Sequence, residues 1–438
     1  MRTNRILSAA LVACGAIGLS TTAHATNGYQ LIGVGSYQKS VGGAVTAAPK
    51  SAMTAITNPA GMAAIGNRAD FSMEAFMPER STDFSATGGD KVDSDAELYG
   101  VPSIGWTAPV ADGSDWYFGG GMYGTSGLGV DYPQSLMMPG AASPTGSDMY
   151  WSGYSNIQFW QMSPTLAYRV DDRLKVGAAL NIDYQSVAFK QHVASDPNGD
   201  GNAEQTVQNF DLSRGASAFG FGLSLGALYD VTDQVTVGLS YKSEQAFSDL
   251  EYNLDYGDIG ELVPGSGFQG QPAGTYKLGL DYPQQAALGI KFSPLTTLDI
   301  SADIKWINWS ATMDDLKVEA PSGGQDVDMD PGWDDQVVYA LGVSWDATPD
   351  LSLRAGFNYA ESPIDNEDAS ANLILPGVVE SHYTVGANYK FNGHWELGGH
   401  FMYAPEVTHT APSNDPQAPG AEIALEETSA GINIGYRF

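Results

Sequence analysis

Apolar and polar residues alternate along most of the chain. In the stretches 174–185, 298–306 and 351–359, apolar side chains occupy every second position. Successive side chains of a β-strand point to opposite faces, so this pattern predicts strands with one apolar and one polar face. Beyond the N-terminus no apolar run is long enough for a membrane-spanning helix. The chain is therefore predicted to be all-β.

Tight turns and long polar connections separate these strands. Turn-forming residues mark six tight turns, two of them Asp-Gly and Asn-Gly. Seven longer polar connections lie between the turns, at about 85–97, 125–156, 191–214, 252–275, 317–334, 362–378 and 410–423. Thirteen connections imply about fourteen antiparallel strands, and short turns on one side with long loops on the other are typical of transmembrane β-barrels. In a soluble β-sandwich, the other fold with this alternation, the apolar faces would form the core.

The N-terminus has the features of a secretory signal. Residues 1–25 contain Arg2 and Arg5, then an apolar segment and an Ala-His-Ala cleavage site. The only cysteine, Cys14, follows Leu-Val-Ala, which also fits a lipoprotein cleavage box. Cleavage there would leave apolar signal residues on the mature chain, so we expect cleavage after Ala25. The mature protein would then have no cysteine, in keeping with passage through the periplasm.

The C-terminus predicts an outer-membrane destination. Ile432, Ile434, Tyr436 and Phe438 alternate with polar or small residues. A last strand that ends in an aromatic residue is a signature of bacterial outer-membrane barrels, which their assembly machinery recognises. We therefore expect the barrel-assembly machinery, outer-membrane lipid and lipopolysaccharide as partners. The signal and this strand favour a transmembrane barrel over a soluble sandwich.

Composition and motifs exclude several function classes. The chain has 51 acidic against 20 basic residues, so nucleic acid is an unsuitable partner, because phosphate binding needs clustered basic side chains. The sequence contains no GxSxG, HExxH or P-loop motif, and its six histidines are scattered. His400 is the best lone candidate for a catalytic residue, but a single histidine in a polar lumen is more often an ordinary wall residue. We expect neither an enzyme nor a cofactor.

The stretch 26–67 does not alternate. It is rich in Gly, Ala, Ser and Thr and nearly free of charge, which suits a compact filler or a flexible linker. The apolar residues Leu31, Ile32 and Met53 favour the filler, because a solvated linker has little reason to carry them. We predict a plug, or hatch, inside the barrel.

Three short motifs in this stretch carry a family resemblance. GYQL at 28–31, SVGGAV at 40–45 and NPAG at 58–61 resemble the hatch of the FadL family of outer-membrane transporters for long-chain fatty acids and other hydrophobic compounds. The resemblance covers essentially the whole mature chain. It implies a hatch over 26–67, a barrel over 68–438, and passive uptake in the outer membrane of a Gram-negative bacterium.

The resemblance also implies where a ligand binds. Gly28, Tyr29 and Leu31 should touch it. The second long connection contains Leu136, Met137 and Met138, whose adaptable apolar side chains suit a capture groove; packing against neighbouring loops is the alternative. Seven basic residues are expected on the lumenal face, namely Lys175, Lys242, Lys291, Lys305, Arg354, Lys390 and Arg437.

Two features bear on the chemistry of the substrate. Arg354 and Arg437 are the better partners for a fatty-acid carboxylate, because a guanidinium binds it with two hydrogen bonds. Fatty-acid transporters of the family place a basic residue beside the start of the tenth strand, where this chain has the acidic sequence 332–335. Neutral hydrocarbons or aromatics are therefore an alternative to fatty acids, and a structural or adhesive surface barrel is a second alternative.

Two further stretches suggest gating and exit. Asn58 and Pro59 interrupt the hatch and are expected to act in its gating. Gly119, Gly120 and Gly121 are consecutive in the third strand, where glycine is destabilising and marks a bulge or close packing. The resemblance implies an inward kink there and a window towards the lipid. Close packing of the hatch against this wall is the alternative.

One loop has a weak calcium signature. Asp196, Asn198, Asp200 and Glu204 place oxygen atoms as in the first half of a calcium loop. The twelfth position holds Val207 instead of glutamate, which excludes an EF-hand. An acidic, solvated surface loop is the simpler interpretation, and no metal is expected.

Overall fold

The wall strands close into one antiparallel barrel. The structure is a computed structural model that describes residues 27–263 and 265–438, so the predicted signal segment 1–25 lies outside the described residues. The strands of the wall are β1 (Arg68–Asp83), β3 (Tyr99–Pro109), β4 (Trp116–Met138), β5 (Asp148–Met162), β6 (Thr165–Arg169), β7 (Leu174–Asp196), β9 (Ala216–Thr232), β10 (Val235–Lys242), β16 (Gln285–Leu295), β17 (Leu298–Ile307), β20 (Gln336–Asp346), β21 (Leu351–Tyr359), β22 (Ser381–Lys390), β23 (Trp395–Thr410) and β24 (Glu422–Tyr436).

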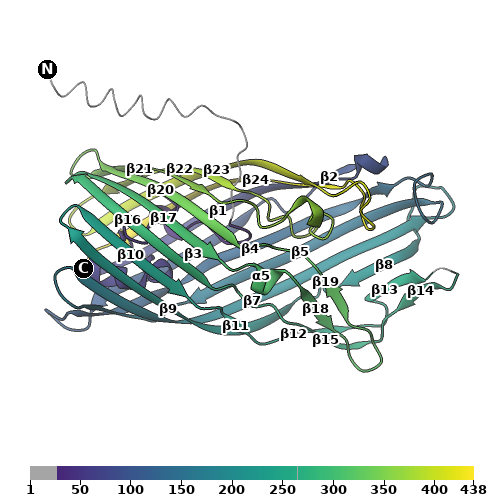
Figure 1. The fold of residues 1–438 in the computed structure, drawn as a ribbon, viewed down its shortest axis with the longest axis horizontal. Helices are drawn as coiled ribbons and strands as arrows, with labels where there is room; N and C mark the ends of the chain where they lie inside the picture. The colour runs from purple at the N-terminus through teal and green to yellow at the C-terminus, as the bar shows by residue number, and fades with distance from the viewer. Residues whose placement is uncertain (1–26, 264) are drawn as a thin grey trace, which may run out of the picture.

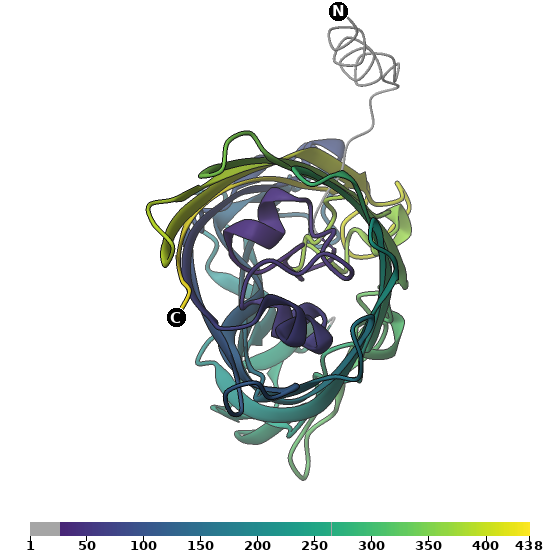
Figure 2. The ribbon, with the colours of Figure 1, turned by 90° about the vertical axis from the view of Figure 1, so that its left-hand side faces the viewer.

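These strands make a ring of fourteen. β5 and β6 share one place in the wall, because both pair with β4 on one side and β7 on the other. The last strand closes the ring by pairing with the first, from Ala69↔Tyr436 to Asp83↔Glu422. Figure 2 shows the ring end on. The predicted fold class, a fourteen-stranded antiparallel barrel around a hatch, is confirmed.

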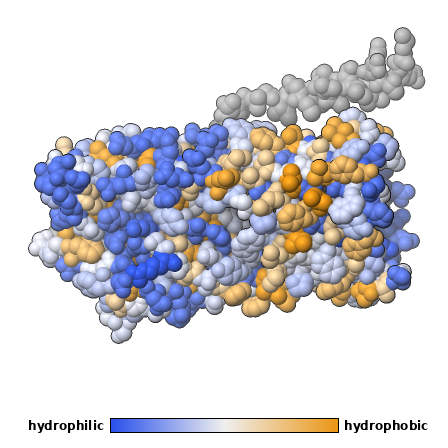
Figure 3. Space-filling model, turned by 180° about the vertical axis from the view of Figure 1, so that it is seen from behind, coloured by the Kyte–Doolittle hydropathy of each residue, from blue (hydrophilic) through white to orange (hydrophobic). Residues whose placement is uncertain are grey.

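The two faces of the wall differ as the alternation predicted. On β24, Ile432 and Ile434 point outward and are 58% and 43% exposed, whereas Asn433 points inward and is 6% exposed. Apolar side chains gather on the outer surface over the half of the barrel with the short turns, and hydrophilic ones over the loop end (Figure 3). No helix among the described residues is long and apolar enough to cross a membrane, an observation that does not bear on strands.

The long loops carry short strands and helices of their own. They contain β2 (Lys91–Asp93), β8 (Gln205–Asp211), β11 (Ala246–Phe247), β12 (Leu250–Leu254), β13 (Ile259–Val263), β14 (Gly267–Gly270), β15 (Gly274–Leu278), β18 (Leu316–Glu319), β19 (Val327–Met329), η2 (Ser85–Thr87), α5 (Ser310–Met313) and η3 (Asn366–Asp368). β12, β15, β18 and β19 form a separate sheet beyond the barrel rim (Figure 1). The connection expected at 125–156 is mostly strand, because β4 and β5 extend far beyond the membrane zone.

The N-terminal segment folds inside the ring. It forms α2 (Gly35–Ser40), α3 (Thr54–Thr57), η1 (Pro59–Gly61) and α4 (Met62–Ile65), drawn in purple within the barrel in Figure 2. Its small side chains let its backbone approach the wall closely. At Gly42, for example, an added Cβ would lie 2.7 Å from the backbone of Phe357.

Candidate ligand-binding site

The start of the hatch pairs with the wall from inside. The amide of Leu31 donates to the carbonyl of Thr125 at 3.2 Å, and the amide of Gly127 donates to the carbonyl of Tyr29 at 3.2 Å. β4 is irregular here, since its register with β5 shifts between Gly124 and Ser126. The hatch thus uses backbone groups of β4 that a neighbouring wall strand would otherwise use.

Tyr29 lies at the centre of an aromatic cluster. Its ring is 2% exposed and stacks on Phe159, with ring centroids 5.5 Å apart and an interplanar angle of 4°. Trp309 and Trp333 approach it to 4.5 and 5.6 Å. Burial raises the pKa of the Tyr29 hydroxyl well above its ordinary value, so the ring stays neutral. This cluster is a preformed apolar surface in the middle of the lumen.

Gly28 makes this arrangement possible. Its φ is +64°, and a Cβ at this position would lie 2.7 Å from Trp333 and 2.9 Å from Trp309. Both the backbone conformation and the space therefore require glycine. The structure thus brings Gly28 and Tyr29 together with aromatic residues from the outer loops, and Leu31 lies two residues further along.

The wall has a gap next to Leu31. β3 pairs with β1 as far as Tyr99, but its pairing with β4 ends at Ser103↔Tyr123. Residues 99–102 of β3 therefore have no ladder partner on β4. A cavity of about 230 Å³ lies at this gap and is lined by Leu31, Phe76, Arg80, Tyr99, Gly100, Val101, Gly124, Ser126, Gly127, Leu128, Ile157, Gln158, Phe159 and Trp160.

The break in the wall is therefore not where the three glycines are. Gly119, Gly120 and Gly121 pair with β3 in a continuous ladder, so on the β3 side the break lies further along β4 than these glycines. On the other side β5 gives way to β6 opposite these glycines, and the amide of Ser163 donates to the carbonyl of Gly121 at 3.1 Å. An added Cβ at Gly119 would lie 2.6 Å from Met62 of the hatch. Close packing accounts for the glycines there.

A second, smaller cavity on the other side of Leu31 has charged side chains in its wall. It has a volume of about 70 Å³, and its lining includes Leu31, the cations Lys242 and Lys305, and the carboxylate of Asp303. The Lys242 ammonium donates to the side chain of Gln161 at 3.1 Å. Because Leu31 lines both cavities, an apolar space and two cationic side chains meet at one hatch residue. The alternation along the strands predicted both lysines on the lumenal face, but it did not distinguish them from the other five basic residues as candidates for ligand binding.

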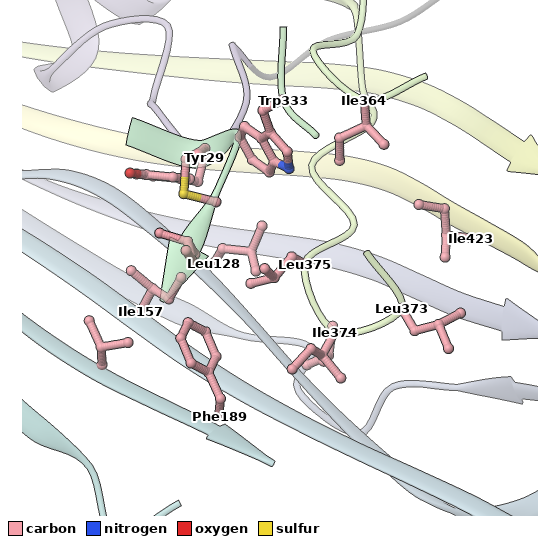
Figure 4. Packing of buried hydrophobic residues seen from close by; sticks show 14 of the residues in the cluster. Tyr29, Leu128, Ile157, Phe189, Trp333, Ile364, Leu373, Ile374, Leu375 and Ile423 are labelled. Atoms are coloured by element: carbon pink, nitrogen blue, oxygen red, sulfur yellow. The ribbon is translucent and has the colours of Figure 1, made fainter. Parts of the chain in front are cut away.

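The connection between β21 and β22 folds into the barrel and covers the cluster. Leu373, Ile374 and Leu375 are at most 4% exposed, and Figure 4 shows Leu375 beside Leu128. The Ser155 hydroxyl donates to the carbonyl of Ile374 at 2.6 Å. The sequence contains a signal for this cover, the apolar run Leu-Ile-Leu-Pro-Gly-Val-Val at 373–379, which the prediction of a polar connection at 362–378 does not take into account.

The residues expected to capture ligand lie at the outer end of β4, not in a loop. Leu136 pairs with Tyr150, and Met138 pairs with Met149. Met137 is 6% exposed and belongs to the main apolar cluster, whereas Leu136 and Met138 are half-buried. Only these last two present apolar surface at the rim.

The hatch is anchored by buried polar contacts. The Asn58 side-chain amide donates to the carbonyls of Thr46 at 2.7 Å and Ala227 at 3.1 Å. Its oxygen accepts from the amide of Ala60, so Asn58 caps η1, which begins with Pro59. In α2, the Lys39 ammonium forms an ion pair with Glu74 of the wall at 3.0 Å, and both side chains are nearly fully buried.

Arg354 and Arg437 lie away from the apolar cluster. Both line a cavity at the short-turn end of the barrel, beside the beginning of β21 and the end of β24. His400 is also a wall residue, and its Nδ1 lies 3.1 Å from the Ser36 hydroxyl of the hatch. The structure therefore does not bring the two arginines to the residues that surround Tyr29.

The carboxylates of the acidic loops accept hydrogen bonds from neighbouring residues of the protein. Burial alone would raise the pKa of Asp335, but hydrogen bonds from Asn308, Ser310 and Trp306 lower it below its ordinary value. The Asp196 carboxylate accepts from the amides of Gly199 and Gly201, each at 2.7 Å.

The other calcium candidates hydrogen-bond to one another. The Asn198 amide donates to Glu204 at 2.9 Å and to Asp200 at 3.3 Å. Among the described residues, no group of three or more His, Cys, Asp or Glu side chains is placed to hold a metal ion.

Comparison with known proteins gives consistent matches. The family model of outer membrane protein transport proteins (OMPP1/FadL/TodX) matches residues 14–438. Outer membrane protein P1 of Haemophilus influenzae is 23% identical over 374 residues, which cover 77% of this chain and 75% of that protein. The long-chain fatty acid transport protein of Escherichia coli K12 is 21% identical over 383 residues, which cover 80% and 81%.

Solved structures share the fold. The Pseudomonas putida toluene transporter TodX superposes with a TM-score of 0.73 at 21% identity, over 94% of this chain and 100% of that one. A Pseudomonas aeruginosa FadL homologue gives a TM-score of 0.70 at 17% identity, over 94% and 100%. At such identities the likeness establishes the architecture alone.

Proposed function

The chain belongs to the family of outer membrane protein transport proteins (OMPP1/FadL/TodX), and from this premise we propose that it takes up hydrophobic molecules passively, with long-chain fatty acids or related lipids as substrates. It resides in the outer membrane of a Gram-negative bacterium. One observation carries the proposal: Leu31 lines both an apolar cavity at a gap in the wall and a cavity that contains two lysines. A fatty acid has a matching apolar chain and carboxylate.

The substrate path begins at the loop end. Leu136 and Met138 at the rim offer a first apolar contact, and the aromatic cluster around Tyr29 offers the next. Transfer of apolar surface out of water drives each step, at roughly 25 cal/mol per Å². Lys242 and Lys305 then provide counter-charges for a carboxylate. No energy source is needed for movement down a gradient.

Exit is proposed to be sideways, through the gap between β3 and β4. Residues 99–102 and 124–127 lie on its two sides, and the cavity there is lined largely by apolar side chains. A hydrophobic molecule gains nothing by crossing the polar lumen to the periplasm. The hatch, anchored by Asn58 and Lys39, controls access because residues 29–31 close the inner side of the gap.

Neutral hydrocarbons or aromatics are the alternative substrates. The acidic stretch 332–335 and the aromatic surroundings of Tyr29 favour them, because neither offers a cation to a carboxylate. The Pseudomonas putida relative is a toluene transporter, and the Escherichia coli relative transports long-chain fatty acids. A structural or adhesive barrel would have no need for an apolar cavity at a break in its wall.

A pair of substitutions separates these substrates. In Lys242→Gln/Lys305→Gln, uptake of oleate should need at least about tenfold more ligand, because both charge-assisted contacts to the carboxylate are lost. Uptake of methyl oleate, which has no charge, should be unchanged. Lys175→Gln, on another part of the lumenal face, is the control. Equal losses for the acid and its ester would contradict carboxylate recognition and favour the neutral substrates.

A further inference from the structure

A basic cavity lies at the opposite end of the barrel from the loops. It has a volume of about 240 Å³ and lies between the hatch and the strands β20 to β24, near their short turns. Five cationic side chains line it against the carboxylates of Asp346 and Glu396, and the cations are Lys50, Arg68, Arg354, Lys390 and Arg437. This excess of positive charge is the opposite of the protein as a whole, whose net charge is −31.

The two carboxylates are already engaged. Asp346 accepts a hydrogen bond from Ser352 at 2.6 Å. Glu396 accepts from Asn388 at 2.6 Å and forms an ion pair with Arg68. Its distance to the Nε of Arg437 is 3.7 Å, longer than a hydrogen bond. Lys50 forms an ion pair with Asp299 at 2.7 Å, and Arg68 forms a second one with Asp70 at 2.6 Å. Arg354, Lys390 and Arg437 are therefore the cations of the cavity that are incompletely neutralised.

Arg354 is the most exceptional of these cations. Its guanidinium lies over the ring of Tyr37, 4.8 Å from the ring centroid, and Tyr37 is held by donating to the carbonyl of Ala48 at 2.6 Å. Within residues 27–263 and 265–438, Arg354 has no carboxylate partner, and its buried Nε has no hydrogen-bond partner. Lys390 likewise forms no ion pair with a described residue. A stacked guanidinium keeps its donor edge free and oriented.

Arg354 is half-buried and its Nε is fully buried, so its unpaired charge is costly, and a bound anion offsets this cost. We propose that this cavity binds a small oxyanion, of the phosphate or carboxylate type. Arg354 presents two N–H groups to two of its oxygens, Lys390 and Arg437 supply further charge, and the hydroxyl of Ser36 faces the same space. Since Ser36 and Tyr37 belong to α2, the anion connects the hatch to the wall at the inner mouth. The site is separate from the transport path and does not depend on the substrate.

The test uses the full-length protein purified from outer membranes in a non-ionic detergent. Crystals soaked in selenate should show an anomalous peak within hydrogen-bond distance of Arg354. Equilibrium dialysis with radiolabelled inorganic phosphate should show one saturable site. Arg354→Gln should weaken this binding at least tenfold, and Lys390→Gln should weaken it less. Lys317→Gln removes a cation from the loop end, where Lys317 pairs with Asp326 at 2.7 Å, and should have no effect.

A second experiment distinguishes free phosphate from a lipid headgroup as the natural source of the anion. If free phosphate is the natural occupant, its binding should be equal in detergent and in phosphatidylglycerol nanodiscs. If a lipid headgroup fills the site, the nanodiscs should reduce phosphate binding in the unaltered protein. Either result supports an oxyanion site. The proposal is overturned if no selenate peak lies at Arg354, or if heat-resistant, folded Arg354→Gln protein binds phosphate as well as the unaltered protein.

Discussion

At the scale of single residues, Tyr29 links the hatch to the apolar path. Its ring makes contacts with four aromatic side chains, yet its buried hydroxyl has no hydrogen-bond partner among the described residues. A buried hydroxyl without a partner costs about 1–3 kcal/mol. The ring therefore stabilises the hatch through its apolar surface. Its hydroxyl group either has no role in the protein alone or forms a hydrogen bond only with a bound ligand.

Two substitutions at Tyr29 separate these contributions. Tyr29→Ala removes a buried ring, a change that costs about 3–5 kcal/mol in well-packed cores, and should lower the apparent affinity for oleate more than tenfold. Tyr29→Phe keeps the ring and should leave the melting temperature equal or slightly higher. Uptake assays at several oleate concentrations and differential scanning calorimetry measure the two effects. Unaltered affinity in Tyr29→Ala would place the ligand elsewhere.

At the scale of elements, buried polar contacts position the hatch in addition to its apolar packing against the wall. Lys39 of α2 is paired with Glu74 of β1. Two hatch amides, those of Val45 and Thr46, donate to Asp303 of β17 at 2.9 and 2.8 Å. Removing one partner of a buried ion pair leaves an uncompensated charge. The hatch should consequently be more sensitive to single charge changes than the wall.

Lys39→Met should loosen the hatch. The unpaired Glu74 carboxylate costs about 3–5 kcal/mol, so α2 should leave its place and the single-channel conductance in planar bilayers should rise. The double variant Lys39→Met/Glu74→Met replaces the pair with apolar side chains and should restore low conductance. If both variants conduct as little as the unaltered protein, the ion pair does not hold the hatch.

The outer end of β4 gives a second prediction for an element. Leu136→Ser/Met138→Ser removes half-buried apolar surface at the rim and should reduce uptake at low oleate concentration while leaving barrel assembly unchanged. Met137→Ser should instead destabilise the rim, because Met137 belongs to the main cluster. Tyr256→Ser, a change at an exposed loop residue, is the control. If the double variant takes up oleate as well as this control, the proposal that these residues capture the ligand is wrong.

The hatch as a whole can be tested by deletion. A chain without residues 28–56 should still form a heat-resistant barrel, because the wall closes through β1 and β24 without it. It should lose regulated uptake, which is measured as oleate uptake together with entry of an unrelated polar dye. Unchanged oleate uptake with no dye entry would mean that the hatch only fills space.

At the scale of the whole molecule, the sequence predicted the wall far better than the site. Alternation along each strand fixes which side chains face the lipid, so the barrel and its strand number followed from sequence. The alternation along a strand predicts which face of the wall a side chain lies on, but it does not predict how far along the barrel axis that side chain lies from the loop end. For this reason the sequence predicted the lumenal side for Arg354 and Arg437 but not their position at the short-turn end of the barrel, away from Tyr29.

The interior depends on long-range contacts that a local pattern does not encode. The three glycines indicated a special place in the third strand, but the break in pairing lies at residues 124–127, where the hatch takes over the hydrogen bonds of β4. That exchange depends on a segment about a hundred residues away in the chain. The inward-folded loop at 373–379 was missed for the same reason, although its apolar run was visible.

The last prediction concerns exit through the wall. An added Cβ at Gly124 would lie 2.8 Å from the side chain of Val101 across the gap, which is close enough for a disulfide. In Val101→Cys/Gly124→Cys, oxidation should tie β3 to β4, close the gap and abolish oleate uptake, and reduction should restore it. The pair Ile104→Cys/Met122→Cys spans the same two strands where their ladder is intact, so its oxidation should change nothing. If the oxidised Val101→Cys/Gly124→Cys barrel transports oleate normally, the substrate does not leave between these strands.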